Sequence, residues 1–421
     1  MHAVLADRRH GHQILRAMSI IRLENGTIAS PKGFLAGGVY CGVKAYGEEK
    51  MDLGLLYSEE PCAVAAVFTK NTVTAPAILV SREHLRDRKA QALVVNSGIA
   101  NVAVGKQGRM DAQTMTELAA QKLGLRPQDV LVASTGVIGV ELPMARIKAG
   151  IDEIQLSRDG GHDMARAILT TDTHTKEIAV SFDAGGGTQA AIGGIAKGAG
   201  MIHPDMATML SFLATDAAVE AGFLQQSLEE AADLTFNMIS VDGDTSTSDT
   251  VALLANGMAG NHLIEAGSPG AQAFREALMQ VSDYLAKQIA RDGEGATKLI
   301  EIRVEKARTR EDARQAARII STSMLVKSAI HGNDPNWGRI MAALGRTGVE
   351  IVESKVDLFI NDMFLLNDGV PVPFYPDAVS RSLDQEEVTI KVVLNIGDAS
   401  ATAWTCDLSE EYVTFNSEYT T

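Results

Sequence analysis

Thr208, in the middle of the chain, stands in a setting from which a threonine hydroxyl could act as a nucleophile. A glycine-rich run from Lys197 to Gly200 precedes it, and Ala207 and Met209 flank it. A threonine hydroxyl reacts poorly unless a base lies beside it, and the threonine's own α-amine can be that base. The amine becomes free only if the peptide bond between Ala207 and Thr208 is cut. Glycine-rich turns before helices are also common, so the pattern alone gives a candidate and not an assignment.

Other sequence motifs that carry chemistry are absent or incomplete. The sequence contains no phosphate-binding GxxxxGK[ST] loop, no GxSxG hydrolase elbow and no HExxH zinc motif. The run Asp242-Gly243-Asp244 begins like a calcium-binding loop, but Thr247 replaces the required glycine and Leu253 the closing glutamate. The nine histidines show no ligand spacing. We therefore expect neither a metal site nor a resident cofactor.

The composition argues against several classes of protein. Hydrophobic residues make up 46% and charged residues 22% of the 421 positions, as in soluble globular enzymes of two or more domains. The net charge of −15 argues against nucleic-acid and anionic-membrane partners, because both require clustered lysine and arginine. No apolar run reaches the roughly 18 residues of a membrane span. Cys41, Cys62 and Cys406 have no disulfide or metal spacing, so we expect a cytoplasmic protein.

Hydrophobic periodicity predicts the elements that must position the candidate residues. Strands and helices mix without a strict βαβ alternation, which favours α/β layers with mixed or antiparallel sheets. The glycine-rich segment 183–194 lies between two strand-like runs and predicts a hairpin. We expect strands over 63–68, 92–96, 130–133, 177–182, 299–304, 356–360 and 388–396, and helices over 111–123, 145–154, 223–238, 271–290 and 310–320.

From about residue 25 to the C-terminus, the sequence closely resembles the ornithine acetyltransferase family, the glutamate N-acetyltransferases of arginine biosynthesis. One glycine-rich match would be weak evidence, but eight separate motifs occur here in the family's order. They are VNSG at 95–98, STGVIG at 134–139, TTDT at 170–173, KGAGMIHPDMATML at 197–210, DGDTST at 242–247, DGEGATK at 292–298, DPNWGR at 334–339 and NSEYTT at 416–421.

The resemblance implies a fold, a cleavage and a reaction. The fold is an αββα-type layered sandwich with mixed sheets, like that of N-terminal-nucleophile enzymes. The precursor would cut itself between Ala207 and Thr208 when the Thr208 hydroxyl attacks the preceding carbonyl. The freed α-amine has an ordinary pKa near 8 and needs only a small downward shift to serve as the base. Thr208 would then accept the acetyl group of N2-acetylornithine as an ester and pass it to glutamate.

The resemblance also implies the residues of the active site. The oxyanion would be stabilised by the Thr135 hydroxyl and the Gly136 N–H, and a Ser-Thr-Gly turn after the apolar run 130–133 can direct both groups to one point. By their chemistry, Lys197 suits the substrate α-carboxylate and Glu294 the ornithine side-chain ammonium. The full substrate-binding set implied by the motifs is Thr173, Lys197, Thr208, Glu294, Asn416 and Thr421.

Residues 1–24 are expected to be an N-terminal extension, either disordered or partly upstream of a true start at Met18. The rest would form an alpha fragment, 25–207, and a beta fragment, 208–421, held in a heterotetramer of two of each. The sequence leaves open whether acetyl-CoA is a second acetyl donor. A self-cleaving amidase or aminopeptidase that uses water as acceptor is the alternative. Two departures from the family pattern, Ile99 and Asp205, bear on substrate range and cleavage rate.

Overall fold

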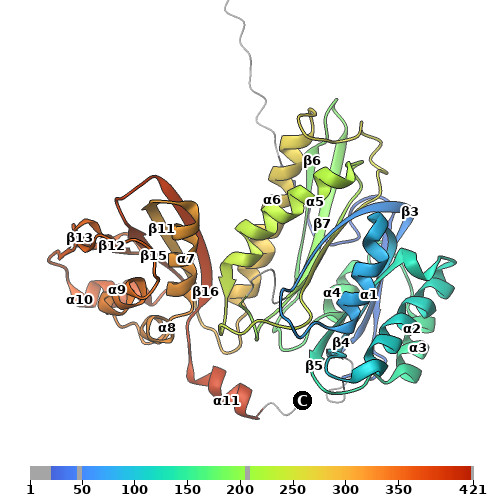
Figure 1. The fold of residues 1–421 in the computed structure, drawn as a ribbon, viewed down its shortest axis with the longest axis horizontal. Helices are drawn as coiled ribbons and strands as arrows, with labels where there is room; N and C mark the ends of the chain where they lie inside the picture. The colour runs from blue at the N-terminus through green and yellow to red at the C-terminus, as the bar shows by residue number, and fades with distance from the viewer. Residues whose placement is uncertain (1–19, 45–49, 204–208, 419–421) are drawn as a thin grey trace, which may run out of the picture.

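The computed structural model describes residues 20–44, 50–203 and 209–418, which form two lobes, each built on a mixed β-sheet (Figure 1). In the larger lobe the strand order is β1-β6-β7-β8-β10-β3-β4-β5, and β2 also pairs with β3. These strands are β1 (Ile21–Arg22), β2 (Phe34–Val39), β3 (Leu53–Phe68), β4 (Lys89–Ile99), β5 (Val130–Val137), β6 (Lys176–Asp183), β7 (Gln189–Lys197), β8 (Leu210–Thr215) and β10 (Thr250–Ala255).

The long strand β3 divides the larger sheet into two layers. Its first half pairs with β2 and β4, its second half pairs with β10, and the β3–β4 register shifts between Tyr57 and Cys62. Side chains of both layers then share one buried core, where Phe34 and Leu93 of the first layer meet the cluster that holds Phe212 of the second. Such shared packing is how two sheet layers bury their facing apolar sides.

Helices cover the outer faces of both layers. In Figure 1, α1 (Pro76–His84), α2 (Gly105–Leu123) and α3 (Met144–Glu153) lie on one side of the strands, and α5 (Ala221–Leu234) and α6 (Ala271–Arg291) lie on the other. The short α4 (Gly161–Ala167) contacts β2 and β3 and contributes to the core between the layers. The predicted αββα-type α/β sandwich is confirmed.

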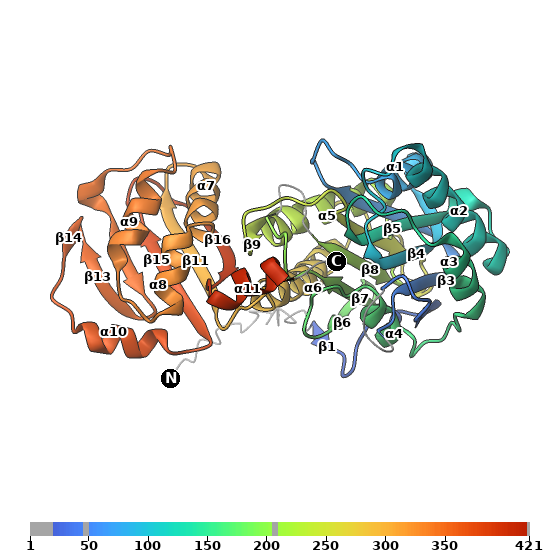
Figure 2. The ribbon, with the colours of Figure 1, turned by 90° about the horizontal axis from the view of Figure 1, so that it is seen from below.

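Except for β9, the smaller lobe follows α6 in the chain, and α6 spans the junction of the two lobes (Figure 2). Its strand order is β14-β13-β12-β15-β11-β16-β9. Within the described residues, no helix is both long and apolar enough to cross a bilayer. The lobe consists of β9 (Ile239–Ser240), β11 (Leu299–Ala307), β12 (Asp357–Ile360), β13 (Met363–Asn367), β14 (Val370–Pro371), β15 (Glu387–Val393) and β16 (Ala399–Cys406), with α7 (Arg310–Ser321), α8 (Met324–His331), α9 (Trp337–Gly345), α10 (Pro376–Leu383) and α11 (Glu410–Glu418).

Every strand and helix predicted from periodicity is present, and 183–194 forms the predicted β6–β7 hairpin. The prediction also left several elements out, among them β2, β16, α1 and α8. It missed β8 and β10 because all of their side chains are buried and neither shows the alternation of a half-exposed strand. The end of the expected N-terminal extension contains a short strand. Ile21 and Arg22 pair with the free edge of β6 as strand β1, while residues 1–19 lie outside the described part of the chain.

A buried ion-pair cluster around Lys176 connects the start of β6 with Gly198, which follows β7, and with Asp292 at the end of α6. Lys176, the first residue of β6, lies with its Nζ 2.6 Å from an Asp172 oxygen and 2.5 Å from an Asp292 oxygen. The Lys176 and Asp172 side chains are fully buried. Asp172 also accepts the Gly198 N–H at 2.6 Å. Burial raises the pKa of Asp172, but Lys176 and Lys197 outweigh it and hold this pKa below its usual range.

Replacing Lys176 by methionine leaves two buried carboxyl groups without their cation. We expect Lys176→Met to lower the free energy of unfolding by about 3–5 kcal/mol at pH 7. The depressed pKa of Asp172 means that its stabilising effect in the unmodified protein is complete above about pH 4 and is lost as the pH falls further. Because the variant's carboxyl groups protonate more readily, the difference between the two proteins should narrow from pH 7 to pH 4.

Denaturant unfolding at both pH values measures this effect. Arg166→Met is the matched control, because Arg166 forms an exposed pair with Asp163 and should contribute at most about 1 kcal/mol. Equal stability losses in the two variants would contradict a structural role for the buried lysine.

Candidate active site

A cavity of about 500 Å³ brings most of the predicted site residues together. Thr135, Gly136, Lys197, Glu294 and Asn416 all line it. Further lining comes from Lys44 and Lys50, the ends of β4 and β5, the turn at 170–172, residues 200–201, the start of β8, the segment 246–249 and the end of α11. Both views show α11 leaving the smaller lobe and extending toward the larger one (Figures 1 and 2). The cavity therefore lies where segments of both halves of the sequence converge.

Three predicted residues lie outside the described part of the chain. They are Ala207, Thr208 and Thr421, and the departure at Asp205 lies outside it as well. Met209, the residue that follows Thr208, lines the cavity. Its carbonyl accepts the Thr250 N–H at 3.0 Å, at the start of the β8–β10 pairing.

The Thr135–Gly136 corner is formed by two parallel strand ends. Because β4 and β5 run in parallel, Thr135 lies opposite Ser97 and Gly136 opposite Gly98. Gly136 has a φ of 129°, and a Cβ there would lie 2.2 Å from the Gly98 carbonyl carbon, so only glycine fits. Within the described residues, the Thr135 hydroxyl has no hydrogen-bond partner. The corner thus places the Thr135 hydroxyl at the cavity, next to the point where the backbones of Gly136 and Gly98 lie in close contact.

Two side chains of the VNSG motif stabilise the backbone next to this corner. The Asn96 amide donates to the Ile99 carbonyl at 2.8 Å, and the Ser97 hydroxyl donates to the Ala167 carbonyl at 2.5 Å. The expectation that the Ile99 departure changes the pocket is not supported. Its side chain is 9% exposed and packs in the core beneath α1, α2 and α3 rather than lining the cavity.

The cavity lining also carries two opposite charges, those of Lys197 and Glu294. Lys197 is buried at the end of β7, and burial lowers its pKa, while Asp172, Asp249 and Glu294 favour its charged form. The Glu294 N–H donates to the Ala199 carbonyl at 2.9 Å. A Cβ on Gly200 would lie 2.3 Å from a Glu294 carboxylate oxygen, so glycine leaves the room that this carboxylate occupies. The site therefore presents an ammonium and a carboxylate to one cavity.

Thr173 does not line the cavity. Its N–H donates to Asp292 at 3.1 Å and its hydroxyl donates to the same carboxylate, whereas its neighbours Thr170 and Thr171 line the cavity directly. In this structure Thr173 therefore orients the Asp292 carboxylate and does not contact the cavity. Its predicted contact with substrate stays a prediction.

Asp242, the first residue of the calcium-like motif, accepts hydrogen bonds from two backbone N–H groups. Asp242 accepts the N–H groups of Met201 at 2.6 Å and Ile202 at 2.9 Å, and the Tyr412 hydroxyl donates to it at 3.3 Å. Within the described residues, no group of three or more His, Cys, Asp or Glu side chains is arranged to bind a metal ion. Asp242 thus fixes the segment that leads toward residue 208 and links it to α11.

Sequence reasoning did not name the buried carboxyl group of Asp249 as a site residue, although it lines the cavity. It lies two residues after the DGDTST motif, beyond Ser248, so a lone acid after an otherwise polar run was the available signal. Burial raises the pKa of Asp249 well above its usual range, and Ser246 and Lys197 oppose this only in part. One of its carboxyl oxygens has no hydrogen-bond partner among the described residues.

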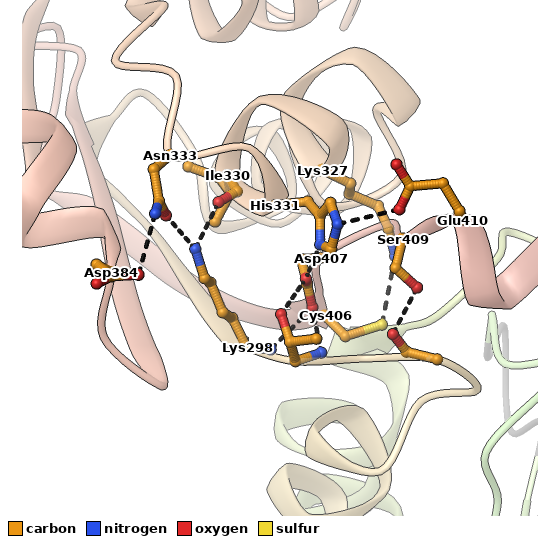
Figure 3. A network of polar contacts seen from close by, with 12 residues as sticks. Lys298, Lys327, Ile330, His331, Asn333, Asp384, Cys406, Asp407, Ser409 and Glu410 are labelled. Carbon is orange, nitrogen blue, oxygen red and sulfur yellow. Dashed lines mark hydrogen bonds and ion pairs between the residues drawn. The ribbon is translucent and has the colours of Figure 1, made fainter.

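A polar network in the smaller lobe anchors α11, which carries Asn416. Figure 3 shows His331 between Asp407 and Glu410, with Nδ1 2.7 Å from Asp407 and Nε2 3.4 Å from Glu410. Ser409 donates to the Gly295 carbonyl at 2.6 Å. From the helix held in this way, the Asn416 amide donates to the Glu294 carboxylate at 2.8 Å.

Taken together, the cavity lining includes cations, anions, an amide and the Thr135 hydroxyl, which has no hydrogen-bond partner among the described residues and lies beside a corner that only glycine fits. A free amino acid carries a carboxylate and an ammonium that match the first two. The hydroxyl and the backbone corner match a developing oxyanion. The arrangement can therefore bind an amino-acid derivative and stabilise acyl transfer.

Comparison with known proteins agrees with this chemistry. Residues 35–421 match the model of the ArgJ family. A relative from Dehalococcoides mccartyi, named arginine biosynthesis bifunctional protein ArgJ, is 50% identical over 403 residues, covering 96% of this chain and 99% of its own length. A relative of the same name from Symbiobacterium thermophilum is 50% identical over 398 residues, covering 94% and 99%.

Among solved structures, the crystal structure of arginine biosynthesis bifunctional protein ArgJ from Bacillus halodurans is 44% identical, with a TM-score of 0.50. The match covers 50% of this chain and 100% of the crystallised chain. By its sequence and by the match over most of its length, the chain belongs to the ArgJ family.

Proposed function

We propose that the protein is an acetyltransferase of arginine biosynthesis that moves the acetyl group of N2-acetyl-L-ornithine to L-glutamate. The observation that carries this proposal is that Lys197 and Glu294 line the same cavity as the Thr135–Gly136 corner. The names of the relatives, arginine biosynthesis bifunctional protein ArgJ, support the same pathway.

In the proposed mechanism, the Thr208 hydroxyl attacks the acetyl carbonyl carbon while the Thr208 α-amine takes its proton. The Thr135 hydroxyl and the Gly136 N–H stabilise the resulting oxyanion. Collapse breaks the amide bond, the proton passes to the departing nitrogen, and ornithine leaves. The α-amine of glutamate then attacks the acetyl-threonine ester and regenerates the Thr208 hydroxyl.

The substrate is held by charge complementarity. We assign Lys197 to the α-carboxylate and Glu294, with its Asn416 partner, to the side-chain ammonium of ornithine. Thr173 and Thr421 complete the proposed binding set. This chemistry needs no resident cofactor. The word bifunctional in the relatives' names supports a second activity, which we assign to the acetylation of glutamate by acetyl-CoA.

We further propose that the chain is cut into fragments 1–207 and 208–421, which stay together in a cytoplasmic heterotetramer of two of each. Strands β8 and β10 belong to the second fragment, but they pair with β7 and β3 of the first. The crystallised Bacillus halodurans chain corresponds to half of this chain, which fits one fragment of a protein cut near its middle.

One assay separates this function from an amidase or aminopeptidase that uses water. Purified protein receives acetylornithine with and without glutamate, and ornithine release is measured. We expect release to depend on glutamate and acetylglutamate to form in equal amount. Equal ornithine release without glutamate would favour the hydrolase. Acetyl-CoA replaces acetylornithine in a parallel reaction to test the second donor.

Self-cleavage can be tested at Thr208. Denaturing electrophoresis should show two bands of 207 and 214 residues. Thr208→Ala should give one uncut and inactive chain, because neither the hydroxyl nor the free α-amine can form. Thr208→Ser, which keeps a hydroxyl, should still be cut. An uncut Thr208→Ala protein with normal activity would refute the mechanism.

The oxyanion role predicts a specific kinetic change for Thr135. Thr135→Ala should lower kcat by about 100-fold, the usual loss of one oxyanion donor, with little change in KM. Thr135→Ser keeps the hydroxyl and should retain most of the activity. A raised KM with unchanged kcat would make Thr135 a binding residue instead.

A further inference from the structure

The proposed reaction gives the cavity two different substrates in turn. Both ornithine and glutamate carry an α-carboxylate, but ornithine has a side-chain ammonium and glutamate a side-chain carboxylate. Glu294 suits the first and repels the second. Lys197 is already assigned to the α-carboxylate. The acceptor therefore requires another cation within reach of the same cavity.

Lys44 lines the same cavity as the Thr135–Gly136 corner. The Asp52 carboxylate accepts the N–H groups of Val43 at 2.7 Å and Lys44 at 3.0 Å, and so fixes the backbone that carries the lysine. A Cβ on Gly98 would lie 2.9 Å from Lys44 Cγ, so the lysine stem crosses the glycine that abuts Gly136. The position of the side chain is thus set by its surroundings.

The Lys44 ammonium has unused hydrogen-bonding capacity. It is 7% exposed, and among the described residues its Nζ has a single hydrogen-bond acceptor, the Met51 carbonyl at 2.7 Å. An ammonium has three donors. No carboxylate of the described chain lies within ion-pair distance of it. A buried ammonium with one neutral acceptor can therefore take an anionic ligand.

The charge of Lys44 is maintained at neutral pH. Burial lowers the pKa of Lys44 to about 8, Asp52 and Asp172 favour the charged form, and Lys197 and Lys50 oppose it. At pH 7 Lys44 is therefore protonated in most of the molecules. A carboxylate that arrives beside it favours the charged form further.

The other lysines around the cavity fit this role less well. Lys176 is fully buried between two carboxylates and does not line the cavity. Lys50 lines the cavity but is exposed, so water screens its charge. Lys44 is the buried cation of the described lining that neither the proposed mechanism nor an ion pair uses.

We propose that Lys44 binds the side-chain carboxylate of the acceptor and makes the second half-reaction selective for glutamate. This inference rests on the proposed acetyl transfer between two amino acids. Glu294 then binds the side-chain ammonium of ornithine, and Lys44 binds the side-chain carboxylate of glutamate. Acidic amino acids are the acceptor class that this cation selects over amides of the same shape.

The test compares the two half-reactions in Lys44→Met. Acetyl exchange between acetylornithine and labelled ornithine reports the donor half-reaction without glutamate. Transfer to glutamate reports the acceptor half-reaction. We expect kcat/KM for glutamate to fall about 10- to 100-fold, the usual effect of a hydrogen bond to a charged group, while exchange changes less than about threefold. The preference for glutamate over glutamine should fall by a similar factor.

Two further variants sharpen the result. Lys44→Arg keeps the charge and should restore much of the preference for glutamate. Lys148→Met removes a lysine from the exposed side of α3 and should leave both half-reactions unchanged. Equal losses in both half-reactions, or an unchanged glutamate preference, would overturn the role of Lys44. Absence of exchange in the unmodified protein would instead overturn the proposed function itself.

Discussion

The active site depends on one buried ammonium, that of Lys176. It begins β6, and its two carboxylate partners come from the 170–173 turn and from the end of α6. Asp172 in turn fixes Gly198, one residue after Lys197, and Asp292 fixes Thr173. Buried charges are stable only when they are fully paired, so these segments can adopt few other arrangements. One wall of the cavity is set by this requirement.

Glycine sets the other dimensions of the cavity. Gly136 allows β5 to approach β4 more closely than any side chain would permit, and Gly200 leaves space for the Glu294 carboxylate. The polar groups thus lie close together because the backbone approaches closely at these two points. The resemblance identified both glycines within motifs, but only the structure shows what each one makes room for.

Much of the site was predictable because its chemistry lies in short contiguous motifs. Thr135, Gly136, Lys197, Glu294 and Asn416 were named from such motifs, and all line one cavity. Asp249 and Lys44 were not named, since a lone acid after a polar run and a lone lysine are weak signals that acquire meaning only from residues distant in the sequence. Strands β8 and β10 were missed for a related reason. Both faces of each strand are buried by elements distant in the sequence, so the strand's own residues show no alternation.

The interleaving of strands fixes the order in which such a protein can be made. Fragment 1–207 made alone would leave β7 and β3 with unpaired edges, and fragment 208–421 would leave β8 and β10 paired only with each other. Unpaired strand edges are sites of aggregation. If the chain is cut as proposed, the sheet must therefore form before the cut. Two separate genes for the halves would be a poor substitute for one continuous chain, because each half would expose unpaired strand edges until it met the other.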